Sequence, residues 1–168
     1  MTETLMHYGA EPIQFDHLRT YAQPPFSEFG KPNGFWVSVR GEDDWPYWCN
    51  SSGYSIGEHE HAVTLAPWAN VLRLAAPYDL HKFTQEFTTG TGWRKGIDWP
   101  AVARLYDGIL IPTYQWSCRM QLNWYYGWDC ASGCIWNSRA VASVVERHTH
   151  ASATNVNTGY TSAPPGTV

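Results

Sequence analysis

The sequence predicts an α+β protein with a mixed, mostly antiparallel β-sheet core and a few short helices. Expected strands outnumber expected helices, and the two do not alternate strictly as they would in a doubly wound parallel sheet. The chain has 168 residues, of which 43% are hydrophobic. That length and composition suffice for one domain with a packed core.

The expected strands are short runs rich in β-branched and aromatic residues, bounded by Gly, Pro or Asn. The expected helices have either an Asp cap followed by proline in the first turn or an apolar face at helical spacing. Candidate caps are Asp43 or Asp44 for the first helix and Asp98 for the third, and Leu80, Phe83 and Phe87 share one face. These patterns predict strands over 4–8, 34–39, 61–65, 70–74, 108–111, 133–136 and 140–145, and helices over 45–49, 79–87 and 99–106.

The domain is expected to span residues 1–147. From residue 148 to 168 the composition shifts to Ser, Thr, Ala, Asn, Gly and Pro, which cannot bury enough apolar area to offset the entropy of ordering. A flexible polar tail is therefore predicted there. No signal-peptide pattern and no apolar run of membrane-spanning length occurs, so we expect a cytoplasmic protein without a membrane partner.

Aromatic residues are abundant and charged residues are few, with 10 Trp and a net charge of −4. So many flat side chains serve either a large core or a pocket for planar ligands. The segment 114–128 contains six of them, most of which are expected to pack, with one or two exposed. The 11 Lys and Arg residues form no basic run, so charge does not argue for binding along a nucleic-acid backbone.

The four cysteines are expected to be buried, reduced thiols. Cys130 and Cys134 are four residues apart, and His59 and His61 are two apart. A zinc site drawn from these is conceivable, but no Cys-x2-Cys pair occurs. No metal site is predicted.

Three short segments carry the chemistry of this sequence. The first is Leu-Met-His-Tyr at 5–8, with His7 near the end of an early strand. The second is Gly-Phe-Trp-Val-Ser at 34–38, followed eleven residues after Trp36 by Tyr47. The third is Ser-Gly-Cys-Ile-Trp at 132–136.

Together these segments resemble the ADP-ribosyltransferase superfamily, in its His-Tyr-Glu branch with the poly(ADP-ribose) polymerases and diphtheria-type toxins. The Lys-Pro-x-Gly lead-in to the second segment is similar to prokaryotic relatives, and the run at 124–136 is similar to actinobacterial or phage proteins. The resemblance implies a split sheet core and a slot that grips the nicotinamide of NAD. The NAD-binding residues implied are His7, Tyr8, Gly34, Trp36, Ser38 and Tyr47, with His7 on the ribose and with Trp36 and Tyr47 as the two aromatic walls.

The third segment departs from the family pattern, which has a catalytic Glu at the start of a late strand. Ser132 stands in that position here, and a hydroxyl cannot supply negative charge. Asp129 is the nearest carboxylate, and Arg119, Gln121 and Asn123 in the preceding loop are candidate contacts for the pyrophosphate or the acceptor. The implied catalytic residues are therefore His7, Asp129 and Ser132.

The resemblance implies an enzyme that transfers ADP-ribose from NAD to a protein or nucleic-acid acceptor and releases nicotinamide. One alternative on the same fold is a module that binds NAD or ADP-ribose without turnover, which the missing Glu favours. Another is an enzyme like the RNA 2′-phosphotransferases, although the basic cluster that such an enzyme needs is not evident.

Overall fold

The computed structural model describes residues 3–25, 30–92 and 95–149. Its main sheet has seven strands in the order β4-β7-β8-β2-β1-β3-β9, and only the pair β4–β7 is parallel. The predicted α+β class with a mixed, mostly antiparallel sheet is confirmed. The strands are β1 (Leu5–Gly9), β2 (Phe35–Val39), β3 (His59–Leu65), β4 (Val71–Arg73), β7 (Gly108–Ile111), β8 (Ser132–Ile135) and β9 (Val141–Thr149).

The helices are short, as predicted. They are α1 (Trp45–Ser52), α2 (Pro77–Phe87), α3 (Trp99–Leu105) and α4 (Trp116–Arg119). Asp44 and Asp98 are confirmed as the caps of α1 and α3, since each accepts a hydrogen bond from a backbone N–H three residues later. Helix α2 starts two residues before its predicted first residue, Asp79, whose carboxylate accepts hydrogen bonds from the N–H groups of Ala75 and Ala76.

Three elements differ from the sequence-based expectation. Helix α4 was not predicted, and neither was a small hairpin of β5 (Thr88–Thr89) with β6 (Gly96–Ile97). Strand β9 continues to Thr149, four residues past the predicted end of this strand, and Thr149 pairs with the start of β3 at His59. The rest of the predicted tail, 150–168, lies outside the described residues.

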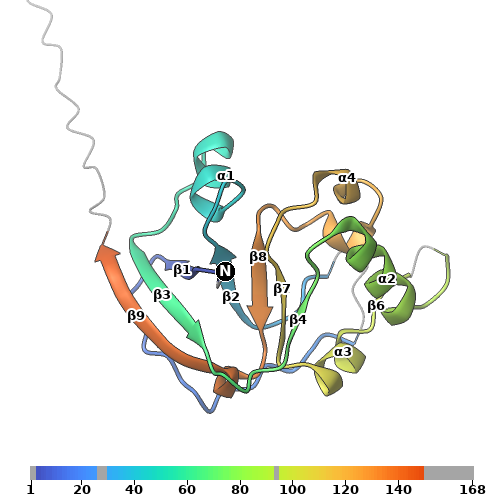
Figure 1. Ribbon diagram of the computed structural model, residues 1–168, viewed down its shortest axis with the longest axis horizontal. Helices are drawn as coiled ribbons and strands as arrows, with labels where there is room; N and C mark the ends of the chain where they lie inside the picture. The colour runs from blue at the N-terminus through green and yellow to red at the C-terminus, as the bar shows by residue number, and fades with distance from the viewer. Residues whose placement is uncertain (1–2, 26–29, 93–94, 150–168) are drawn as a thin grey trace, which may run out of the picture.

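The sheet changes direction between its two central strands. Strand β1 pairs with β3 over five residues but with β2 over only two, Leu5 with Val39 and Met6 with Ser38. Figure 1 shows β3 and β9 on one side of this junction and β8, β7 and β4 on the other, with α1 at the end of β2. Strands β1 and β2 therefore part just beyond the Met6–Ser38 pair, next to His7 on β1 and two residues from Trp36 on β2.

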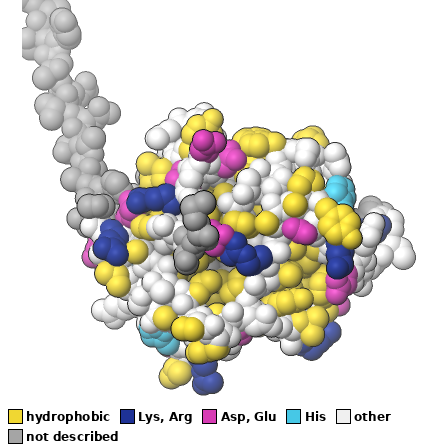
Figure 2. Space-filling view, viewed as in Figure 1, with side chains coloured by type: hydrophobic (Ala, Val, Ile, Leu, Met, Phe, Trp, Pro, Cys, Tyr) yellow, Lys and Arg dark blue, Asp and Glu magenta, His cyan; other side chains and the backbone are white. Residues whose placement is uncertain are grey.

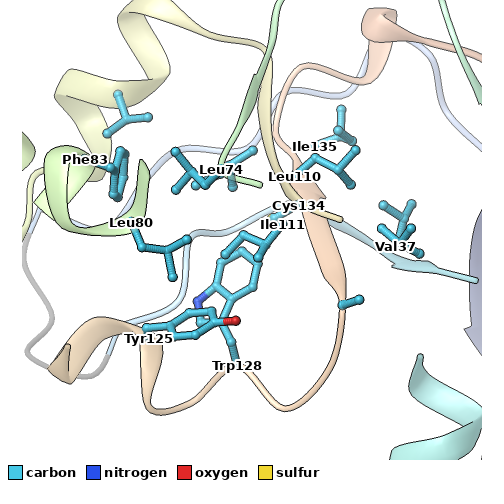
Figure 3. Packing of buried hydrophobic residues seen from close by; sticks show 14 of the residues in the cluster. Val37, Leu74, Leu80, Phe83, Leu110, Ile111, Tyr125, Trp128, Cys134 and Ile135 are labelled. Atoms are coloured by element: carbon cyan, nitrogen blue, oxygen red, sulfur yellow. The ribbon is translucent and has the colours of Figure 1, made fainter. Parts of the chain in front are cut away.

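The core lies between β7, β8 and the helices that gather beside them. Leu80, Phe83 and Phe87 of α2 are buried, which confirms the predicted apolar face. Figure 3 shows Tyr125 and Trp128 next to each other against this core, with ring centroids 6.2 Å apart. Among the described residues, no helix is both long enough and apolar enough to cross a bilayer.

Four of the six aromatic side chains in the segment 114–128 pack into the core, namely Tyr114, Trp124, Tyr125 and Trp128. The other two, Trp116 and Tyr126, are exposed at 56% and 49%. This confirms the prediction that most of the cluster is packing and that one or two members face solvent.

Candidate functional site

The His7 side chain fills the gap where β1 and β2 part. Its Nδ1 atom lies 2.8 Å from the carbonyl oxygen of Trp36. A carbonyl oxygen only accepts hydrogen bonds, so Nδ1 carries the proton and donates it. The neutral ring then keeps an unshared electron pair on Nε2. His7 also stacks on Phe35, with centroids 4.4 Å apart, and these two contacts orient the imidazole.

Burial lowers the pKa of His7 below its ordinary value. The hydrogen bond to Trp36 opposes this shift, and the nearby His61 ring adds to it. Since the charged imidazole is disfavoured, His7 is neutral near pH 7. A neutral ring with a free Nε2 accepts a hydrogen bond from a ligand hydroxyl, such as one on a sugar.

A cavity of about 300 Å³ opens beside this junction. Four segments that are distant in the sequence supply its walls: β1, β2 with its lead-in, the start of α1, and the entry to β8. We call it the central cavity. Its lining residues are Met6, His7, Tyr8, Lys31, Trp36, Val37, Ser38, Trp45, Asp129, Cys130 and Ser132.

Most of the sequence-predicted site residues come together there. His7, Tyr8, Trp36 and Ser38 line the central cavity from the central strands, and Asp129 and Ser132 line it from the neighbouring β8 segment. Ser38 and Ser132 are cross-strand partners in the β2–β8 ladder, which places the third sequence segment against the second. The fold thus brings together all three segments that the sequence singled out.

Tyr47 is an exception, and its expected place as the second aromatic wall needs correction. Its side chain is 56% exposed and does not line the central cavity. Successive residues of an α-helix are about 100° apart, so Tyr47 points about 200° away from Trp45, while Cys49 returns to within about 40° of it. Because Cys49 is buried, Tyr47 faces away from the protein.

Trp45 supplies the second indole of the central cavity, and sequence reasoning missed it. Its backbone N–H donates to Ser38 Oγ at 2.9 Å, and its Nε1 donates to the carbonyl of Ile56 at 3.0 Å. It also stacks on Trp48, with centroids 5.1 Å apart and planes 21° apart. The signal was available, because Trp45 and Cys49 share the buried side of a helix that Asp44 was predicted to cap.

Gly34 also lies outside the central cavity and has a structural reason to be glycine. A Cβ there would come within 2.5 Å of Cys134 Sγ and 2.7 Å of the carbonyl oxygen of Ile135. The residue therefore allows β2 to enter the sheet close against β8. Gly34 lines a second, more open depression of about 500 Å³, which shares Trp36 with the central cavity.

Asp129 carries the negative charge of the central cavity, and two cations face it. Its Oδ1 lies 3.2 Å from Arg119 Nη2, and its Oδ2 lies 3.8 Å from Lys31 Nζ. Lys31 stands in the lead-in to β2, and sequence reasoning did not select it for the site. Its contact with Asp129 spans 98 positions in the chain, so only the fold reveals it.

Ser132 and its neighbour Cys130 are poorly suited to act as nucleophiles. The Ser132 hydroxyl donates to the carbonyl of Cys130 at 2.9 Å, and Ser132 is almost fully buried. Burial raises the pKa of the Cys130 thiol to about 12, so the reactive thiolate is absent at neutral pH. The Tyr8 phenol is likewise held protonated, because burial and the nearby Glu60 carboxylate raise its pKa.

All four cysteines are buried with free thiols. Among the residues that the structure describes, no group of three His, Cys, Asp or Glu side chains could hold a metal ion. On the face seen in Figure 2, Lys and Arg side chains stand in small separate groups beside Asp and Glu rather than in a continuous stripe. The chemistry of the site therefore rests on indole faces, one neutral imidazole, hydroxyls and one carboxylate.

Comparison of the chain with protein-family models, with curated proteins and with solved structures finds no match in any of the three.

Proposed function

We propose that the protein binds NAD with its nicotinamide end in the central cavity and transfers ADP-ribose to an acceptor. One observation carries the proposal: the parting of β1 and β2 gathers His7, Trp36, Trp45 and Asp129 around one cavity. Nicotinamide is a flat ring, and aromatic faces bind such rings by stacking. The neutral His7 ring offers Nε2 to a ribose hydroxyl.

The sizes of the two depressions support an extended dinucleotide. A volume of about 300 Å³ is at the lower end for small-molecule sites, which suits the nicotinamide and its ribose but not the whole molecule. Trp36 also lines the second depression. The adenosine end can therefore leave the central cavity past Trp36 and lie along that more open surface.

The proposed reaction breaks the bond between the nicotinamide nitrogen and C1′ of the ribose. The bonding electron pair stays on the nitrogen, so nicotinamide leaves as a neutral molecule and the sugar becomes cationic. A carboxylate beside C1′ lowers the energy of that cation, and we propose Asp129, which lines the cavity, for that role. An acceptor oxygen or nitrogen then bonds to C1′ and gives up its proton to solvent.

A second candidate function is binding of NAD or ADP-ribose without turnover. The contacts of Asp129 favour it, because Arg119 and Lys31 offset the negative charge that the reaction needs. The alternative that resembles RNA 2′-phosphotransferases has less support, since those two cations of the site are already paired with Asp129.

The experiment uses purified full-length protein with NAD, with and without cell lysate. Release of nicotinamide together with thermal stabilisation by NAD supports the transferase. Stabilisation without release supports the binding module. The absence of both stabilisation and release would contradict both functions. If release occurs, Asp129→Asn should lower its rate at least tenfold, the order expected when a preorganised electrostatic group is removed.

Matched variants separate the central cavity from the slot expected from sequence. Trp36→Leu keeps an apolar side chain beside Trp128 but removes the flat face, and it should abolish stabilisation by NAD. Tyr47→Ala should leave stabilisation intact, because Tyr47 lies outside the cavity. Melting temperatures without NAD check that both variants fold, and a loss of binding in Tyr47→Ala would contradict the assignment of Trp45 as the second ring.

A further inference from the structure

The ammonium group of Lys31 lies in the mouth of the central cavity where a positively charged ligand would bind. Its Nζ is 5.3 Å from the centroid of the Trp36 ring and 3.8 Å from Asp129 Oδ2. An aromatic face and a carboxylate are the groups that attract an organic cation most strongly. In the structure, a side chain of the protein itself meets both.

Two neighbours shape this position for a lysine. A Cβ on Gly127 would come within 3.3 Å of Lys31 Cε, so the absence of a side chain there leaves room for the lysine stem. Arg119 holds the other oxygen of Asp129 at 3.2 Å. The carboxylate therefore stays in place, with Oδ2 available, when Lys31 moves away.

The ion pair that fixes the Lys31 ammonium group is weak. The Lys31 side chain is 41% exposed, and 3.8 Å is a long contact for an ion pair. Exposed pairs of this kind add little to stability, because solvent screens them and the flexible lysine stem resists being fixed. A ligand of the same charge can replace the ammonium group without leaving the cavity with an uncompensated carboxylate.

We propose that the central cavity is a site for a planar organic cation of the pyridinium type, and that Lys31 occupies the place of that cation in the unliganded protein. Ligand entry displaces the ammonium group from Trp36 and from Asp129 Oδ2. Lys31 is thus a built-in competitor that weakens the binding of charged rings more than that of neutral ones. The inference rests on the proposed function only in using the same cavity and does not need the transfer reaction.

The first test measures binding of two probes by calorimetry, the cation 1-methylnicotinamide and neutral nicotinamide. Removing the competitor in Lys31→Met should tighten cation binding roughly two- to fivefold, the equivalent of losing one exposed cation–π contact. Binding of neutral nicotinamide should change less than about twofold. Lys82→Met is the matched control and should bind both probes as the native protein does.

The second test follows the displacement itself. The chain has three lysines, Lys31, Lys82 and Lys95, so acylation by an amine-reactive reagent can be assigned to each by mass spectrometry. Adding 1-methylnicotinamide should raise the labelling of Lys31 relative to Lys82. Gly127→Ala should raise it without ligand, because the added Cβ crowds the lysine stem.

Three results would overturn the inference: no binding of 1-methylnicotinamide, equal or weaker cation binding in Lys31→Met, or unchanged Lys31 labelling on ligand addition. Weaker binding would mean that Lys31 supports the cation site instead of competing for it. These readouts are separate from nicotinamide release. A protein that binds the cation as described but neither binds nor cleaves NAD would end the proposed function and leave this inference standing.

Discussion

At the scale of single residues, His7 shows how one hydrogen bond sets the chemistry of a side chain. The Nδ1–H group of His7 donates a hydrogen bond to the carbonyl oxygen of Trp36, with Nδ1 and the oxygen 2.8 Å apart, which leaves Nε2 as an acceptor. The sequence predicted that His7 lies near the end of a strand. It did not predict this hydrogen bond, because the acceptor belongs to β2, the strand that parts from β1. The place of His7 near the end of a strand was predictable from the sequence, and the tautomer of its ring was not.

This environment makes the stability of the protein depend on pH. Burial lowers the pKa of His7 in the folded state, so the unfolded chain binds the proton first as the pH falls below about 6.5. The free energy of unfolding should therefore decrease from pH 7 to pH 5, by at most about 1.4 kcal/mol per pH unit from this group. Urea denaturation across that range measures the decrease.

The variant His7→Gln removes the titrating group and should show a smaller decrease over the same range. Its stability at pH 7.5 provides the reference for any packing loss. An identical pH dependence in the variant and the native protein would show that His7 is not buried as the structure has it.

At the scale of elements, α1 connects helix capping to the cavity. The Asp44 carboxylate accepts the N–H of Tyr47 at 3.0 Å, and the helix starts with Trp45, whose indole lines the cavity. Helix α3 begins in the same way at Asp98, which accepts the N–H of Ala101 at 2.9 Å, but it contributes nothing to the central cavity. The two caps are a natural pair for comparison.

Asp44→Ala and Asp98→Ala should each lower the free energy of unfolding by about 1 kcal/mol, the usual loss for a removed N-cap. Only Asp44→Ala should also weaken ligand binding in the central cavity, because fraying of α1 loosens Trp45. Chemical denaturation and calorimetry with 1-methylnicotinamide measure the two effects. Equal binding by both variants would show that Trp45 does not depend on its helix cap.

At the scale of the whole molecule, the aromatic segment before β8 ties the cavity to the core. Trp128 is 1% exposed and lies edge-on to Trp36, with centroids 4.9 Å apart. The Tyr114 hydroxyl donates to the carbonyl of Trp128 at 2.5 Å. The cavity wall therefore rests directly on the buried core.

Trp128→Ala should cost about 3–5 kcal/mol of the free energy of unfolding, the usual loss for a buried tryptophan. That is a large part of the stability of a typical domain. Trp116→Ala, in the same segment but 56% exposed, should cost no more than about 1 kcal/mol. Thermal and urea unfolding of both variants test the contrast, and similar losses would contradict the division of the segment into packed and exposed rings.

The sequence alone determined the elements of this protein and much of its candidate site. All seven strands of the main sheet and the three longest helices follow from β-branched and aromatic runs, from apolar residues at helical spacing, from proline in the first turn and from Asp caps, all of which act within a few residues. His7, Trp36, Asp129 and Ser132 were singled out through the family resemblance of three short segments. They do lie around one cavity.

Only the tertiary structure decided how those elements form the central cavity and which side chains face it. The early parting of β1 from β2, the choice of Trp45 over Tyr47, and the meeting of Lys31 with Asp129 depend on contacts between segments far apart in the chain. Such contacts arise from the packing of whole surfaces, and no local pattern of residues encodes them. Several residues of the site were therefore open to prediction, whereas Trp45 and Lys31, the facing directions of the side chains and the charge opposite Asp129 were not.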